Sequence, residues 1–237
     1  RSTDNGNSWI SVNYGLTNYN IRALAICGST IFAATYDCGI FQSTDNGDSW
    51  IPNNYDFSNI VIECMVVNGS NIFIGTFGQG IFLSTNNGMT WRAMNNGLTD
   101  RNVLTIAASG DKIFAGTWFD GVFLSTNNGE TWKAINNGLA ILRVDKIKIC
   151  DSVVYIGTFH QLNKSTDFGN NSTSFDFYFN SIESIEVKGT NIFVSSLTDG
   201  LFKSSDYGIT WENADTNLTN LSVYDIKIRE SDIFVGT

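Results

Sequence analysis

Proline, histidine and basic residues are scarce in this sequence. Pro52 and His160 are the only residues of their kinds, and 14 Lys and Arg stand against 23 Asp and Glu, for a formal net charge of -9. The basic residues are scattered, so the clustered positive charge of a nucleic-acid-binding protein is missing. We therefore expect no nucleic-acid partner, and acidic lipid surfaces are disfavoured for the same reason.

Long apolar runs are missing as well. No stretch of about eighteen apolar residues, the length needed to span a membrane, occurs in the chain, and we expect no membrane insertion. No signal peptide is visible. Because the sequence opens at Arg1, part-way into a repeat, we expect any targeting segment to lie outside it.

Cysteine is present without a pattern that would make it a ligand or a cross-link. Cys27, Cys38, Cys64 and Cys150 have no metal-type spacing, and we expect four free thiols that are buried or half-buried. One histidine and four dispersed cysteines make no metal cluster. The sequence predicts neither a metal nor a cofactor.

One eight-residue motif recurs at a nearly fixed interval. Its clearest copy, at residues 43–50, reads Ser-Thr-Asp-Asn-Gly-Asp-Ser-Trp. Other copies begin at Ser2, Ser84, Ser125 and Ser204, with an altered copy at Ser165. The first residues of successive copies lie 41, 41, 41, 40 and 39 positions apart. A period near forty indicates stacked supersecondary units, and we expect one domain over residues 1–237.

Four short apolar runs make up each repeat. In the cleanest repeat they cover residues 103–108, 112–118, 121–125 and 131–135, and each ends at a Gly, Asn or Asp turn. Such runs are too short and too rich in β-branched residues for helices. Four-stranded antiparallel units of about forty residues, repeated around an axis, make a β-propeller. The sequence therefore predicts an all-β propeller.

The count of these units predicts about six blades. Five complete blades are expected over residues 21–218, and Pro52 falls in an expected outer strand, where a missing N–H is tolerated. A sixth blade would be split between the ends, with a fourth strand at residues 9–12 and two strands within 223–237. Most of its third strand is missing, so we expect an incomplete blade or an array that continues beyond the sequence. An open strand edge makes self-association through this blade a hypothesis.

The repeated motif, Ser/Thr-x-Asp-x-Gly-x-Thr/Ser-Trp, resembles the Asp-box, or BNR repeat, over essentially the whole chain. Its third residue is Asp or Asn at Asp4, Asp45, Asn86, Asn127, Asp167 and Asp206, and its last is Trp at Trp9, Trp50, Trp91, Trp132 and Trp211. The resemblance implies a propeller like those of sialidases, glucan-cleaving glycosidases, sorting receptors and a photosystem assembly factor. The short, nearly identical repeats look most like secreted bacterial propellers, which implies an extracellular or cell-surface protein.

The chemistry of the motif predicts a structural turn between the third and fourth strands. Asp or Asn can accept backbone N–H bonds, Gly supplies positive φ, and Trp fills the space between blades. The acidic ligand that would complete a calcium loop is missing. In the altered copy at Ser165 we expect extra residues before Phe175, which would take the place of Trp.

Candidate ligand-binding residues lie where the repeats differ, in the turns after the second strand. They are Tyr36, Asp37, Phe77, Gln79, Trp118, Asp120, Phe159, His160 and Asp199. Aromatic side chains among carboxylates and amides suit carbohydrate stacking or a protein groove, although they could also be ordinary packing. Trp118 is the only Trp outside a motif and is the preferred anchor.

A second candidate set begins the first strand of successive repeats. It consists of Arg22, Glu63, Asp145, Glu183 and Tyr224, with Leu104 at the remaining position. Glycosidases use two facing carboxylates, and sialidases add an arginine cluster. Arg101 and Arg143 lie in the connections between repeats, but the Arg-Ile-Pro motif of sialidases is missing. The alternative is that these are solvated strand starts, and no Ser, His and Asp set forms around His160.

These features favour a non-catalytic scaffold that binds a carbohydrate or protein on the rim opposite the motifs. Its loops are short, which leaves little room for a deep pocket. The alternative is a sialidase-like or other glycoside hydrolase acting at the channel mouth. A third reading, an assembly factor, predicts a basic docking patch that this acidic chain lacks.

Overall fold

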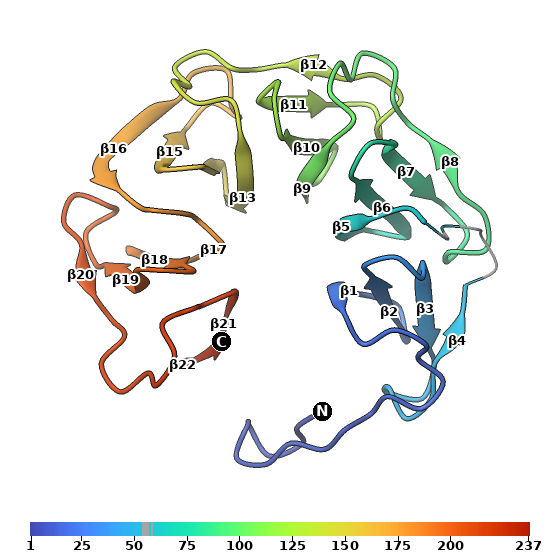
Figure 1. The fold of residues 1–237 in the computed structure, drawn as a ribbon. Coiled ribbons are helices and arrows are strands. Elements are labelled where there is room, and N and C mark those ends of the chain that lie inside the picture. The colour runs from blue at the N-terminus through green and yellow to red at the C-terminus, as the bar shows by residue number, and fades with distance from the viewer. Residues whose placement is uncertain (54–56, 58) are drawn as a thin grey trace. The chain divides into compact units, whose positions relative to one another are not determined.

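The protein is built from consecutive four-stranded sheets (Figure 1). The computed structural model describes residues 1–53, 57 and 59–237, and within these the chain forms strands and turns but no helix. Five sheets have four strands in chain order and one has two. Neighbouring strands pair antiparallel in every blade. This confirms the predicted all-β class and the five complete blades.

The strands follow the predicted repeat. The first blade has β1 (Ile21–Cys27), β2 (Thr30–Thr35), β3 (Ile40–Ser43) and β4 (Ile51–Pro52). The second has β5 (Ile62–Asn68), β6 (Asn71–Thr76), β7 (Gly80–Ser84) and β8 (Arg92–Ala93). The third has β9 (Val103–Ser109), β10 (Lys112–Thr117), β11 (Val122–Ser125) and β12 (Lys133–Ala134). The fourth has β13 (Val144–Cys150), β14 (Val153–Thr158), β15 (Gln161–Ser165) and β16 (Thr173–Tyr178). The fifth has β17 (Ser184–Lys188), β18 (Asn191–Ser196), β19 (Gly200–Ser204) and β20 (Glu212–Asn213), and a last hairpin has β21 (Asp225–Arg229) and β22 (Asp232–Gly236).

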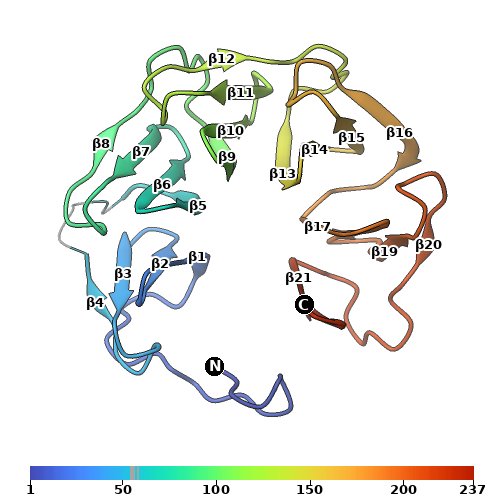
Figure 2. The same cartoon turned by 180° about the vertical axis from the view of Figure 1, so that it is seen from behind.

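The chain divides into two compact units. The first comprises residues 1–96 with 101–103, and the second comprises residues 97–100 with 104–237. Within the first unit, β1 lies against β5; within the second, β13 lies against β17, and β17 against β21 (Figures 1 and 2). In these three pairs the first strands of neighbouring blades pack side by side, whereas β13 of the fourth blade lies against β10 of the third.

The two ends of the blade series depart from a full repeat. Pro52 lies on β4, the outer strand of its sheet, as predicted. The predicted strand at residues 9–12 is wrong, because these residues have no strand conformation. The only backbone pairing of these residues is between Ile10 and Arg1, with the Ile10 amide donating to the Arg1 carbonyl at 2.9 Å, among the bonds of the described residues. The four cysteines are free thiols, and three are half-buried as predicted, but the prediction is wrong for Cys38, which is exposed.

In the five complete blades the core lies along the second strand. That strand is apolar because it is flanked by strands on both sides and its side chains are buried. Phe73 and Ile74 on β6, and Phe114 and Ala115 on β10, have no exposed surface. Charged groups also link the first strands in the second unit: Glu186 accepts from Lys148 at 2.6 Å and from Lys227 at 2.8 Å.

The repeated motif, called the octapeptide below, folds the same turn in each copy. In the copy at residues 43–50, one oxygen of Asp45 accepts from the Ser49 amide at 2.9 Å and the Ser43 hydroxyl at 2.7 Å, and the other accepts from the Ser49 hydroxyl. Asn86 reproduces this pattern with its carbonyl, and its Nδ2 donates to the Thr90 hydroxyl at 2.9 Å. Asn can therefore replace Asp in the turn without losing a hydrogen bond.

The altered octapeptide at Ser165 is regular in its backbone, and the expected insertion before Phe175 is wrong. Asp167 accepts from the Asn171 amide at 2.9 Å, as in the other copies. Ser172 takes the eighth position, with its amide bonded to the Asn137 carbonyl. Phe175 lies three residues further on, stacked on Tyr155 with its edge against Trp211. The aromatic group of this copy is displaced along β16, while the turn is unchanged.

The loss of stability in acid should differ between octapeptides with Asp and octapeptides with Asn at the third position. Hydrogen bonds from the Ser49 hydroxyl and amide lower the pKa of Asp45 to about 2. A depressed folded-state pKa stabilises the fold above the unfolded pKa near 3.8, and this contribution is lost as the pH falls toward 2. We expect Asp45→Ala to lower the melting temperature at pH 7, and Asp45→Asn to preserve it while reducing the loss between pH 4 and 2. A melting temperature that falls equally in both variants would contradict this role.

Candidate functional site

The candidate site lies on one edge of the blades, opposite the octapeptides. Because strands alternate in direction, the turns between second and third strands share an edge with the connections to the next blade. The octapeptides, between third and fourth strands, lie at the other edge. We call the first the bc edge. It carries the turns whose residues differ most between repeats.

An arginine lies between two aromatic rings at the bc edge of the second unit. The guanidinium carbon of Arg143 is 4.1 Å from the ring centroid of Trp118, which follows β10, and 4.5 Å from that of Phe159, which follows β14. Its Nε donates to Asp145 at 2.9 Å. Stacking and the ion pair hold the planar guanidinium in one orientation. Trp118, Arg143, Asp145, Phe159 and Glu183 are called the arginine cluster below.

The two carboxyl groups of the arginine cluster are hard to ionise. Burial raises the pKa of Asp145, although Arg143 beside it acts in the opposite direction. Burial also raises the pKa of Glu183, with Lys146 opposing and the Asp145 charge adding to the shift. The Oδ2 atom of Asp145 is buried and has no hydrogen-bond partner among the described residues. Buried, unpaired carboxyl oxygens are uncommon outside functional sites.

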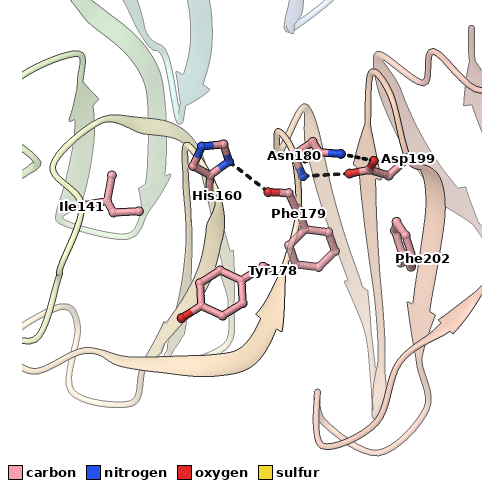
Figure 3. Close-up of a pocket in the computed structure, with 7 residues that line it drawn as sticks. All are labelled: Ile141, His160, Tyr178, Phe179, Asn180, Asp199 and Phe202. Carbon is pink, nitrogen blue, oxygen red and sulfur yellow. Dashed lines mark hydrogen bonds between the residues drawn. The ribbon is translucent and has the colours of Figure 1, made fainter.

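A pocket of about 450 Å³ opens beside the arginine cluster, between the fourth and fifth blades. The rings of Phe159 and His160 lie 4.0 Å apart and connect the two features. The pocket is lined by Ile141, His160, Tyr178, Phe179, Asn180, Asp199 and Phe202 (Figure 3). Most of the Tyr178 side chain, 70 %, is exposed. A flat aromatic surface is thus available to a ligand at the rim.

Polar groups on the far side of the pocket are already paired. Figure 3 shows Asn180 directed at Asp199, and the Asn180 amide donates to that carboxylate at 2.8 Å. Burial alone would raise the pKa of Asp199, but the hydrogen bonds from Asn180 and Ser196 hold it below its usual value. The Nδ1 atom of His160 lies 3.2 Å from the Phe179 carbonyl. These bonds fix the shape of the pocket wall.

The structure brings together only part of the predicted set. Trp118, Asp145, Phe159 and Glu183 form the arginine cluster, with His160 and Asp199 in the neighbouring pocket. Asp120 accepts from the Thr99 hydroxyl at 2.5 Å, which ties its turn to the connection before the blade. Tyr224, 60 % exposed, begins the last hairpin and takes part in none of these contacts.

The remaining predicted residues lie in the first unit. The guanidinium of Arg22 stands 5.0 Å from the Tyr36 ring centroid. Asp37 accepts from Asn18, and Phe77 pairs with Asn102 through an isolated bridge. The last two predicted residues are Glu63, which is half-buried on β5, and Gln79, which is exposed in the turn before β7. Each of these contacts joins two residues, whereas the arginine cluster contains five.

Several residues of the site were not among the sequence candidates, although Arg143 was noted as a residue of a connection between repeats. Arg143 lies two positions before Asp145 in a connection, and Tyr178 and Asn180 follow the irregular fourth blade. Arg143 could have been identified because it lies two residues before Asp145, the acidic residue at the start of a first strand. Nothing in the sequence places Tyr178, because it depends on the extended β16 (Thr173–Tyr178).

Among the residues that the structure describes, no group of three or more His, Cys, Asp or Glu side chains could hold a metal ion. The same residues include no apolar helix of membrane-spanning length.

Comparison with known proteins identifies the fold. No protein-family model and no curated protein matches this sequence. Among solved structures, the extracellular domain of BT4673 from B. thetaiotaomicron is similar with a TM-score of 0.79 and 19 % identity, over 95 % of this chain and 33 % of that one. An ancestral GH74 enzyme has a TM-score of 0.74 and 20 % identity, over 92 % of this chain and 34 % of that one. YCF48 from Cyanidioschyzon merolae has a TM-score of 0.62 and 11 % identity, over 93 % of each chain. All are β-propellers, which confirms the predicted fold.

The extent of these similarities differs. This chain spans about a third of the BT4673 and GH74 structures, and nearly the whole of YCF48. Identities of 20 % and below establish a shared fold and no shared activity.

Proposed function

We propose that this protein is an extracellular Asp-box propeller, one domain over residues 1–237, that binds a carbohydrate at the bc edge of its second unit without cleaving it. One observation carries the proposal: the Arg143 guanidinium lies 4.1 and 4.5 Å from two aromatic rings, next to an open pocket rimmed by Tyr178. Sugars bind through apolar ring faces stacked on aromatic side chains and through hydroxyl pairs that meet planar polar groups. The exposed Tyr178 ring offers the first contact, and the Arg143 guanidinium, held between the Trp118 and Phe159 rings, offers the second.

The charge and the comparisons support a carbohydrate over a nucleic acid or a basic docking surface. The chain has a net charge of -9. The similar structures include a GH74 xyloglucanase from Xanthomonas campestris and an extracellular bacterial domain. They also include YCF48 bound to a D1 peptide, so a protein ligand is the competing outcome.

The proposal is tested by titrating neutral β-glucan and xyloglucan oligosaccharides against the protein in a calorimeter. We expect Trp118→Ala to weaken binding roughly five- to 150-fold, because loss of an aromatic contact and of the support for Arg143 removes about 1–3 kcal/mol. The matched control is Tyr207→Ala, which removes an aromatic group that is 54 % exposed in an octapeptide. Equal binding by both variants, or binding of peptides alone, would contradict the proposal.

A second function, glycoside hydrolysis, is favoured by one specific observation. Asp145 and Glu183 both have raised pKa values, and a general acid must stay protonated near the working pH. In this mechanism one carboxyl group protonates the glycosidic oxygen. The other, as a carboxylate, either activates a water molecule or attacks the anomeric carbon. Release of reducing ends from the same oligosaccharides, abolished by Glu183→Gln, would establish this function in place of simple binding.

A further inference from the structure

The fourth blade lacks a polar contact that three other blades have at the bc edge. In the first, third and fifth blades, an acid of the turn after the second strand binds a polar residue of the connection before the blade: Asp37 with Asn18, Asp120 with Thr99, and Asp199 with Asn180. The corresponding turn of the fourth blade, at residues 159–160, has no acid. The connection before it reads Ala-Ile-Leu at residues 140–142. Apolar side chains therefore replace the polar contact in this blade.

The pocket between the fourth and fifth blades opens at this place, and much of its wall is apolar. Ile141 lines one side, and the rings of Phe179 and Phe202 line the other (Figure 3). These two rings pack edge to face, with their centroids 5.6 Å apart. The volume of about 450 Å³ lies within the range of about 300–1,000 Å³ that is usual for small-molecule sites. The pocket therefore has room for an apolar group the size of a ring.

The carboxylate in the pocket wall is already occupied by donors of the protein. The Oδ2 atom of Asp199 accepts from the Asn180 amide at 2.8 Å and from the Ser196 hydroxyl at 3.2 Å. Its Oδ1 atom accepts from the Asn180 side chain and from the Thr198 hydroxyl at 3.2 Å. These four bonds match the roughly four lone-pair sites of a carboxylate. A sugar hydroxyl placed against Asp199 would lose its bonds to water and gain none there, which favours an apolar occupant.

The pocket continues into the arginine cluster. The Arg143 guanidinium carbon lies 4.5 Å from the ring centroid of Phe159, and that ring lies 4.0 Å from the ring of His160, which lines the pocket. Tyr178, at the rim, is 70 % exposed. All of these residues belong to the second unit. One ligand can therefore contact both the arginine cluster and the pocket.

We propose that the ligand is a carbohydrate with an aromatic substituent, whose sugar lies at the rim beside Arg143 and Tyr178 and whose aromatic ring enters the pocket between Ile141 and Phe202. This inference rests on the proposed carbohydrate binding and adds the chemical class of the ligand. An aromatic ring fits better than a saturated one, because it makes edge-to-face contacts with Phe179 and Phe202. No Lys or Arg is among the described residues that line the pocket, so the substituent is neutral.

Three compounds that differ in one group test the inference by calorimetric titration: methyl, cyclohexyl and phenyl thio-β-cellobioside. Their sulfur linkage resists hydrolysis, so binding is measured even if the protein cleaves glycosides. We expect the phenyl compound to bind about tenfold tighter than the methyl compound or more, because a buried aromatic ring contributes at least that factor. The cyclohexyl compound should fall between them. Ile141→Asn, which places an amide in the pocket wall, should bring the ratio of phenyl to methyl affinity close to one.

The matched control is Leu142→Asn, because Leu142 is the next residue, is 40 % exposed and is not part of the pocket lining. It should keep the affinity ratio, and circular dichroism melting verifies that each variant is folded. Trp118→Ala should weaken the phenyl and methyl compounds by the same factor.

The outcomes separate this inference from the proposed function. Equal affinities for the phenyl and methyl compounds, a cyclohexyl compound that binds as tightly as the phenyl compound, or a ratio unchanged by Ile141→Asn would each overturn the inference while carbohydrate binding stands. A protein that binds none of the three compounds would instead contradict the proposed function itself.

Discussion

Replacing Gly97 by alanine is expected to destabilise the protein far more than the same change at Gly110. Gly97 has a φ of 87°, and an added Cβ would lie 2.2 Å from the Trp132 carbonyl oxygen. The left-handed backbone alone costs a residue with a Cβ about 1–2 kcal/mol. The clash adds to this because a backbone carbonyl cannot rotate away as a side chain can. We expect the free energy of unfolding to fall by about 3 kcal/mol or more.

Gly110 is the matched control because it shares the conformation and lacks the contact. Its φ is 59°, and an added Cβ would meet no atom within 4 Å. Gly110→Ala should therefore show only the conformational cost of about 1–2 kcal/mol. Denaturant unfolding of both variants gives the comparison. Equal losses would mean that the connection does not hold the octapeptide of the next blade.

Replacing Arg143 by methionine is expected to lower the free energy of unfolding at pH 7 by about 2–3 kcal/mol. Removing one partner of a fully buried ion pair costs about 3–5 kcal/mol, and the third of the Arg143 side chain that is exposed reduces this value. The change leaves Asp145 buried with neither oxygen bonded to a cation. Methionine keeps much of the apolar contact with Trp118 and Phe159. The decrease in the free energy of unfolding therefore measures the effect of removing the guanidinium charge.

The pH dependence identifies the carboxyl group responsible. Because burial raises the folded-state pKa of Asp145, its effect favours folding below the unfolded pKa near 3.8 and is lost as the pH rises through the folded pKa. Without Arg143 that folded pKa rises further. The deficit of Arg143→Met should thus be small near pH 3 and grow toward pH 7. In an Asp145→Asn background the growth should disappear; a deficit that persists unchanged would assign it to another group.

The sequence was most informative where the repeat is strict. The spacing of the octapeptides predicted the five blades and the strand order, because one turn and one apolar strand recur under the same constraints. The prediction was wrong at residues 9–12 and at the copy containing Ser172. A strand there depends on a partner strand, and the place of an aromatic side chain depends on packing between blades.

The site was predicted in part for a related reason. Trp118, Asp145 and Glu183 were identified because they interrupt the repeat at positions that share an edge. Their approach to one another could not be predicted, because it depends on side-chain direction and on the distance between neighbouring blades. Arg143 lies in a connection whose path differs from blade to blade, so its place between Trp118 and Phe159 emerges only from the folded structure.

The indole signals of the six tryptophans offer the most direct test of the proposed binding site, since five belong to octapeptides and Trp118 alone lies at the bc edge. A nitrogen–proton correlation spectrum is recorded while xyloglucan oligosaccharide is added, with assignments from single Trp→Phe variants. We expect a saturable shift of the Trp118 signal, with the five octapeptide signals unchanged. Shifts confined to octapeptide tryptophans, with Trp118 unmoved, would contradict it.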